Sequence, residues 1–374
     1  MSSIQFCDLQ AQYRRIQTAV DARIQKVLTH GQYIMGPEIA ELERDLARFA
    51  GAQHAVSVSS GTDALLIALM AKGIGNGDAV FVPAFTFTAT AEVVLMAGAV
   101  PVFVDVQEGT FNIDPHDLLE KIRQVKSAGR LLPKAVIAVD LFGLPADYSR
   151  LSGIAAGHEL LLLADAAQSF GATLGDRRVG ALTEITATSF FPAKPLGCYG
   201  DGGALFTDSA ETASLFDSIR QHGKGTQKYE IVRTGVNGRL DTLQAAILLE
   251  KLRIFPGELG ARESLACFYD AQLDGKVTLP PRVSGMRSAW AQYTICVDRR
   301  DEVAARLKAE GVPTAVYYPR PLHLQPAYSR FGAGAGSLPV SERLCRTVLS
   351  LPMHPYMEKE TAETICRAVR QALS

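Results

Sequence analysis

Short apolar runs alternate with helical patterns through the first two thirds of this 374-residue chain. Several runs are unbroken, which is typical of strands covered on both faces, and strands that alternate with helices favour a parallel sheet. We therefore expect an α/β fold in which a mostly parallel, seven-stranded sheet lies between helices. The expected strands are 55–58, 79–82, 102–104, 135–139, 160–164, 187–190 and 204–207, and the expected helices between them are 62–71, 89–97, 115–124 and 148–156.

The pattern changes after residue 240. Residues 241–273 read as one long helix, which Pro256 can interrupt. A strand at 293–297 and helices at 302–310 and 359–373 follow. We expect a large domain over residues 1–245 and a smaller C-terminal α+β domain over residues 246–374.

Composition excludes several classes of function. The formal net charge is −1 and 21% of the residues are charged, so nothing favours nucleic acid or an anionic membrane as a partner. Neither a membrane-spanning run nor a secretory signal is evident. The six cysteines form no Cys-x-x-Cys pair, which indicates reduced thiols, a cytoplasmic protein and no zinc site.

Lys194 lies in an apolar stretch, 188–197, that ends in glycines. Burial favours the neutral form of a lysine, and a neutral amine is a nucleophile toward carbonyl groups. For an arbitrary lysine the commoner explanation is an ammonium that reaches from a loop into water. The residues upstream of Lys194 decide between the two.

Asp165 follows the strand expected at 160–164, and ligands of open α/β sheets bind outside the carboxyl ends of strands. A carboxylate there can pair with the cationic ring nitrogen of pyridoxal phosphate, or it can cap a helix. Gln168 can donate to the phenolic oxygen of that cofactor, or it can be a surface amide.

Gly61 and Thr62 lie at a turn from strand to helix, where backbone N–H groups can bind a phosphate or simply cap the helix. Phe87 follows the next strand and can stack on a planar cofactor, although such a residue is more often part of the core.

Together these segments resemble the pyridoxal phosphate-dependent sugar aminotransferases of the DegT/DnrJ/StrS group. The resemblance extends over nearly the whole chain, and Asp165 and Lys194 stand 29 residues apart, as suits that family. The matching segments are 6–9, 61–65, 83–87, 165–171, 189–197, 200–203, 235–241 and 351–354.

The resemblance implies the type I fold of aspartate aminotransferase and a homodimer with active sites shared between subunits. It implies that Lys194 is the catalytic residue, bonded to the cofactor and acting as the base, and that Asp165 pairs with the pyridine nitrogen. The other cofactor contacts it implies are Gln168 and Phe87 at the ring, and Gly61, Thr62, Ser189 and the neighbouring subunit's Asn237 at the phosphate.

The same family implies glutamate as amino donor and a keto-sugar nucleotide as acceptor. Some members have histidine in place of the lysine and remove a sugar hydroxyl, so Lys194 favours transamination. Segments 30–38 and 233–239 most resemble enzymes that act on UDP-2-acetamido-2-deoxy-3-oxo-glucuronate, which suggests surface polysaccharide (O-antigen) biosynthesis. A dTDP- or UDP-linked 3-oxo or 4-oxo deoxyhexose is the alternative acceptor.

Arg239 can bind the carboxylate of a uronate through two parallel hydrogen bonds. It can equally bind glutamate or pair with Asp241. The Tyr317-Tyr318-Pro319 segment departs from the family's usual His-Tyr-Pro. Tyr318 and His323 are further candidates for substrate contact, or else packing residues near the subunit interface.

Two other classes of protein compete with this interpretation. The glycines at 73–77 precede a strand, so they do not fit the dinucleotide fingerprint of a nicotinamide-dependent oxidoreductase. A non-catalytic regulator that binds pyridoxal phosphate is disfavoured because the chain has no basic patch or added DNA-binding segment.

Overall fold

The computed structural model describes residues 4–227 and 229–374. Its centre is a seven-stranded sheet in the order β1-β9-β8-β5-β4-β2-β3. Only β9 runs antiparallel to its neighbours, which confirms the mostly parallel α/β sheet expected from the sequence. The strands are β1 (His54–Val58), β2 (Asp78–Pro83), β3 (Val100–Val104), β4 (Leu132–Val139), β5 (Leu161–Asp165), β8 (Ile185–Ser189) and β9 (Gly203–Thr207).

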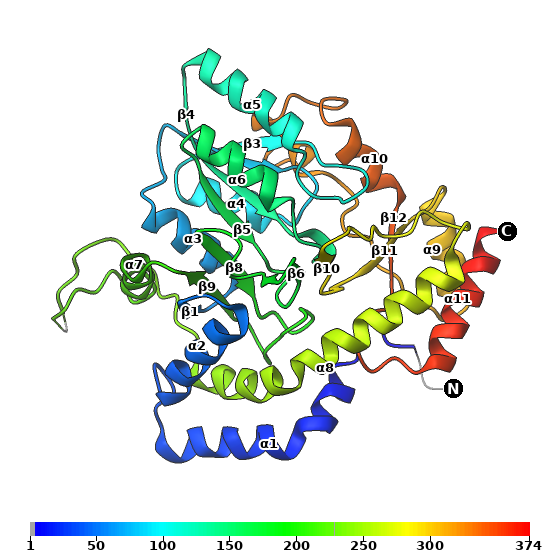
Figure 1. Cartoon of the computed structure of the whole chain (residues 1–374), viewed down its shortest axis with the longest axis horizontal. Helices are drawn as coiled ribbons and strands as arrows, with labels where there is room; N and C mark the ends of the chain where they lie inside the picture. The colour runs from blue at the N-terminus through cyan, green and yellow to red at the C-terminus, as the bar shows by residue number, and fades with distance from the viewer. Residues whose placement is uncertain (1–3, 228) are drawn as a thin grey trace.

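Helices cover both faces of the sheet (Figure 1). Along β2, Val80 and Val82 pack toward α3 and α4, whereas Phe81 packs toward α5 and α6. This alternation is the period of two that a strand buried on both faces requires. The helices around the sheet are α2 (Pro37–Ala50), α3 (Gly61–Ala71), α4 (Ala89–Met96), α5 (Pro115–Ala128), α6 (Tyr148–Gly157) and α7 (Ala210–Arg220).

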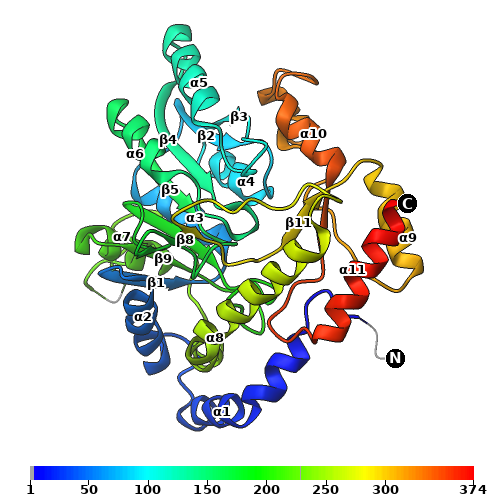
Figure 2. The same cartoon turned by 45° about the vertical axis from the view of Figure 1, so that its right-hand side comes forward.

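A second core lies beyond the sheet, at the right of Figures 1 and 2. Strand β11 (Tyr293–Cys296) pairs with β12 (Val348–Leu351), and Tyr269, Tyr293 and Ile365 are buried in the core beside them. The helices of this part are α9 (Arg300–Ala309), α10 (Pro339–Thr347) and α11 (Lys359–Leu373), with single turns η2 (Leu322–Leu324) and η3 (Ser329–Phe331).

Helix α8 (Thr242–Leu273) connects the two cores and continues through Pro256 without the interruption that the sequence allowed. Its first half packs with the sheet through Leu248, and its second half packs with the small core through Leu265. The expected boundary at 245/246 therefore falls within one helix. A small sheet also joins β6 (Thr173–Leu174) and β7 (Arg177–Arg178) to β10 (Met286–Arg287).

An N-terminal helix, α1 (Leu9–His30), packs along α8. Within the described ranges, no helix is both long and apolar enough to cross a bilayer, and no cluster of potential metal ligands is present. All six cysteines are free in the structure.

Candidate active site

The parallel strands β2, β4, β5 and β8 end at one edge of the sheet, and a cavity of about 420 Å³ opens there. Eight of the predicted site residues line this cavity: Gly61, Thr62, Phe87, Asp165, Gln168, Ser189, Lys194 and Tyr318.

Lys194 and Asp165 face this cavity from two different segments. Burial lowers the pKa of the Lys194 amine, and the charge of Asp165 opposes that shift. Burial raises the pKa of Asp165, and hydrogen bonds from Ala167 N (3.2 Å) and Thr90 Oγ1 (3.0 Å) oppose it. The residues directly after Asp165 form turns and not an α-helix, which rules out a helix-capping role for Asp165.

A corner whose geometry suits an anion lies at the start of α3. Ser60 caps the helix by accepting a hydrogen bond from Asp63 N (3.0 Å), so the first-turn N–H groups at Gly61 and Thr62 remain directed at the cavity. A Cβ added to Gly61 would lie 2.7 Å from Ser189 Cβ. Glycine therefore allows α3 to begin directly against the end of β8. The hydroxyl residues Thr62 and Ser189 line the cavity at this corner.

The Gln168 side chain has a fixed orientation. Its Oε1 accepts a hydrogen bond from Phe142 N at 2.8 Å, so its amide nitrogen points away, toward Tyr318 Oη at 3.5 Å. Burial raises the pKa of Tyr318, which keeps that hydroxyl neutral. Gln168 can thus present hydrogen-bond donors to a ligand in the cavity.

Phe87 is not a core residue. Its side chain is 52% exposed, whereas that of Phe85, two residues earlier, is 1% exposed. The Phe87 ring lies at the cavity with its centroid 6.1 Å from that of Tyr318. This placement favours stacking on a ligand over packing in the core.

Sequence reasoning missed two side chains at or behind this cavity. Asp140 is fully buried after β4 and accepts hydrogen bonds from Ser169, Tyr148 and Ala146, and burial raises its pKa to about 7. Gln292 lines the cavity, and its buried Oε1 has no hydrogen-bond partner in the described structure. Asp140 follows a strand as Asp165 does, so the signal for it was present.

Three predicted residues lie outside the cavity. Asn237 is exposed and accepts a hydrogen bond from Arg239 Nη2 at 2.5 Å, so Arg239 contacts Asn237 instead of Asp241. His323 is buried on η2, with Nε2 3.2 Å from Glu342 Oε1. That environment matches the packing alternative for His323, and its contact with substrate stays a prediction.

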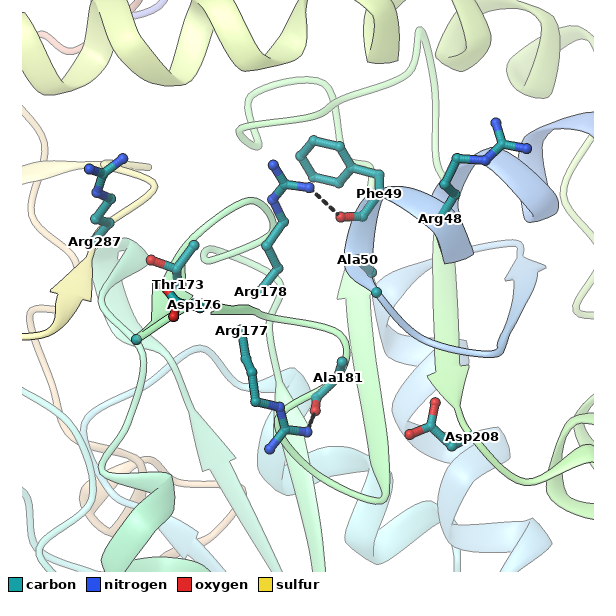
Figure 3. Close-up of a pocket in the computed structure, with 12 residues that line it drawn as sticks. Arg48, Phe49, Ala50, Thr173, Asp176, Arg177, Arg178, Ala181, Asp208 and Arg287 are labelled. Atoms are coloured by element: carbon teal, nitrogen blue, oxygen red, sulfur yellow. Dashed lines mark hydrogen bonds between the residues drawn. The ribbon is translucent and has the colours of Figure 1, made fainter.

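A larger hollow of about 690 Å³ lies at the end of α2 (Figure 3). Three of the four arginines that line it are engaged within the chain: Arg178 donates to Phe49 O (2.8 Å), Arg177 donates to Ala181 O, and Arg48 pairs with Asp45 at 3.0 Å. No lysine, histidine or cysteine is among the described residues that line it, so the strand-end cavity is the better candidate for chemistry.

The residues of the strand-end cavity fit pyridoxal phosphate. The corner at Gly61 suits a phosphate, the half-exposed Phe87 ring suits a flat heterocycle, and the Asp165 carboxylate suits a ring cation. The Lys194 amine, with its lowered pKa, suits reaction with an aldehyde.

This fold and cavity define an aminotransferase of fold type I. More particularly, the chain belongs to the DegT/DnrJ/EryC1/StrS aminotransferase family, whose model matches residues 14–370.

Relatives match over nearly the full length. The chain is 47% identical over 367 residues to the UDP-2-acetamido-2-deoxy-3-oxo-D-glucuronate aminotransferase of Pseudomonas aeruginosa, covering 98% of this chain and 99% of that one. A DegT DnrJ EryC1 StrS aminotransferase from Brucella abortus matches with a TM-score of 0.97 and 50% identity, covering 98% and 99%. NtdA of Bacillus subtilis, solved with bound cofactor PMP, matches with a TM-score of 0.91 and 30% identity, covering 100% and 86%. Pyridoxal phosphate is therefore the expected cofactor.

Proposed function

We propose that this protein transfers an amino group from glutamate to a keto-sugar nucleotide, namely UDP-2-acetamido-2-deoxy-3-oxo-glucuronate, for the synthesis of a surface polysaccharide such as an O-antigen. One observation carries the proposal. The Lys194 amine and the buried Asp165 carboxylate share a cavity, in a chain that is 47% identical to an enzyme named for that substrate.

Each cavity residue has a proposed task. Bound pyridoxal phosphate supplies an electron sink for the negative charge that develops at the donor carbon. Lys194 would hold the cofactor covalently, and its amine would serve as the base that carries the proton leaving the donor carbon, a task that its lowered pKa favours. Asp165 keeps the ring nitrogen protonated, and Gln168 donates a hydrogen bond to the ring oxygen. Gly61, Thr62 and Ser189 hold the phosphate.

We propose that a second copy of the chain completes the site. The segment between α7 and α8 extends away from the body in Figure 1, and its side chains at Ile231 and Val232 are 60% and 49% exposed. Exposed apolar side chains on a projecting segment are typical of an interface. In a homodimer this arm would bring Asn237 and Arg239, at its base, to the partner's phosphate and sugar.

Arg239 supports the uronate as acceptor. Its Nε is buried and has no hydrogen-bond partner in the described structure, although Nη2 contacts Asn237. A carboxylate that accepted from this guanidinium would satisfy the unpaired nitrogen. The glutamate carboxylate and an uncharged deoxyhexose on dTDP or UDP remain the competing interpretations.

The test compares three acceptors with glutamate as donor, and mass spectrometry follows the aminated product. They are the 3-oxo uronate, its uncharged counterpart UDP-2-acetamido-2-deoxy-3-oxo-glucose, and a dTDP-linked 4-oxo deoxyhexose. We expect kcat/KM for the uronate to exceed that for its counterpart by about 100-fold in the native protein, and Arg239→Gln to remove most of the difference. Preference for an uncharged acceptor would refute the uronate assignment. Failure of glutamate to yield 2-oxoglutarate would favour a non-catalytic regulator.

We also propose a cytoplasmic location and retain the division into domains at residue 245. The free state of all six cysteines supports the first proposal. The separate core around Tyr269 and Tyr293 supports the second.

A further inference from the structure

Lys251 is a second lysine with an unusual environment. It lies on α8 and is fully buried, and its Nζ donates a hydrogen bond to Gly197 O at 2.6 Å. The same Nζ lies 4.1 Å from the centroid of the Tyr199 ring, within the range of a cation–π contact. Gly197 and Tyr199 both belong to the loop that carries Lys194, on the side of the loop that faces α8.

A second side chain of α8 holds the same loop. Gln244 Oε1 accepts a hydrogen bond from Tyr199 N at 2.8 Å, and Gln244 Nε2 lies 3.4 Å from Tyr199 O. Cys198 N also donates to Phe190 O at 2.8 Å, which closes the loop on itself. Helix α8 therefore holds the backbone that leads from Lys194 to β9 at Gly197 and Tyr199, and a bond within the loop adds to that hold.

A purely structural role explains Lys251 poorly. No ion pair to a carboxylate is found for Lys251 in the part of the chain that the structure describes, and an ammonium buried without one is costly. A methionine would fill the same space without that cost.

The groups that face Lys251 come from three segments. They are Cys7 of the N-terminal segment, Cys198 and Tyr199 of the loop, and Glu258 on α8 itself. Burial lowers the pKa of Lys251 to about 8, and the neighbouring thiols and Glu258 oppose the shift. Lys251 therefore remains mostly cationic at neutral pH and keeps the stronger, charge-assisted hydrogen bond to Gly197.

We propose that Lys251 is a positioning residue for Lys194: its bond to Gly197 and its contact with Tyr199 fix the loop so that the Lys194 amine is held in line for proton transfer. This inference rests on the proposed function. Lys251 is not among the residues that line the strand-end cavity, so its effect should fall on kcat and on the environment of Lys194 but not on substrate binding.

The test compares Lys251→Met, which removes the donor, with Lys251→Gln, which keeps a neutral donor. Lys276→Met, at an exposed lysine, is the matched control. We expect Lys251→Met to lower kcat by about tenfold or more, with KM for both substrates changed by less than about twofold. The pH midpoint of the cofactor's visible absorbance should also move, and Lys251→Gln should recover part of both effects.

Gln244→Leu keeps the proposal testable if Lys251→Met does not fold, because Gln244 holds the same loop from a less buried position. For Gln244→Leu we expect changes in kcat and in the pH midpoint of the visible absorbance that have the same direction as in Lys251→Met but are smaller. Native kcat and an unmoved midpoint in folded Lys251→Met, or in Gln244→Leu if the former does not fold, would overturn the inference. Absence of turnover and of the visible band in the unmodified protein would instead overturn the proposed function.

Discussion

The charge of Asp165 should account for much of the catalytic rate. Asp165→Asn keeps the shape of the side chain, and its amide oxygen can still accept the hydrogen bond from Ala167 N. Thr90, which now donates to the carboxylate at 3.0 Å, can turn its hydroxyl to accept from the new amide. We therefore expect the variant to fold normally and to lose only the charge.

The magnitude follows from electrostatics in a partly buried site. Two opposite charges about 4 Å apart interact by about 4 kcal/mol at an effective dielectric constant of about 20. If that stabilisation is lost in the transition state, the rate falls by about 10³. KM for glutamate should change little, because Asp165 is predicted to contact the cofactor and not the donor.

The assay is a single-turnover reaction with glutamate that follows 2-oxoglutarate. Asp176→Asn, at an exposed carboxylate far from the cavity, is the control. A rate for Asp165→Asn within about fivefold of the native rate would refute the electrostatic role, since that corresponds to about 1 kcal/mol. In the cofactor-free protein, the same change should lower the pKa of Lys194 further, because the Asp165 charge now raises it. The pH dependence of amine labelling at Lys194 measures that shift.

The remaining predictions concern cofactor binding and stability. Gly61→Ala places a Cβ 2.7 Å from that of Ser189 and should weaken cofactor binding by about tenfold or more, as fluorescence titration would show; unchanged affinity would mean that the corner is not the phosphate site. Phe87→Leu should also weaken cofactor binding, yet change the free energy of unfolding by less than about 1 kcal/mol because the ring is 52% exposed; a large loss of stability would instead assign Phe87 to the core. Asp140, with its pKa raised to about 7, keeps its proton in the folded protein up to about pH 7, whereas the unfolded chain loses it above about pH 4, so stability should fall by about 3 kcal/mol from pH 4 to 7. Asp140→Asn should flatten that slope in urea unfolding, and an unchanged slope would contradict the assignment.

The strands of the central sheet were predictable because several are unbroken apolar runs that need burial on both faces and because strands and helices alternate. Helix α1 was missed, although Asp8 caps its start and Gly31 ends it with a φ of 70°. The buried side of α1 is a narrow stripe that includes Gln12, and a stripe of that kind gives weak periodicity. The continuity of α8 through Pro256 was not predictable either, because packing on two cores outweighs the local cost of proline.

Some residues of the candidate site were likewise predictable from the sequence, and others were not. Residues that follow strands, such as Asp165 and Lys194, come together because parallel strands end at one edge. The sequence could not place Gln292 in the cavity or His323 beside Glu342, because both arrive from the small domain through its packing. The hydrophobic pattern of the sequence predicts the order of helices and strands along the chain. The orientation of side chains such as Gln292 and His323 depends instead on how the two domains pack together.

The most direct measurement asks which amine carries the cofactor. The protein is loaded with pyridoxal phosphate, reduced with borohydride, digested and mapped by mass spectrometry. We expect a single cofactor adduct, at Lys194, and its loss in Lys194→Ala together with the visible absorbance. An adduct at Lys251, or an absorbance band that survives in Lys194→Ala, would contradict the assignment of Lys194 as the catalytic amine.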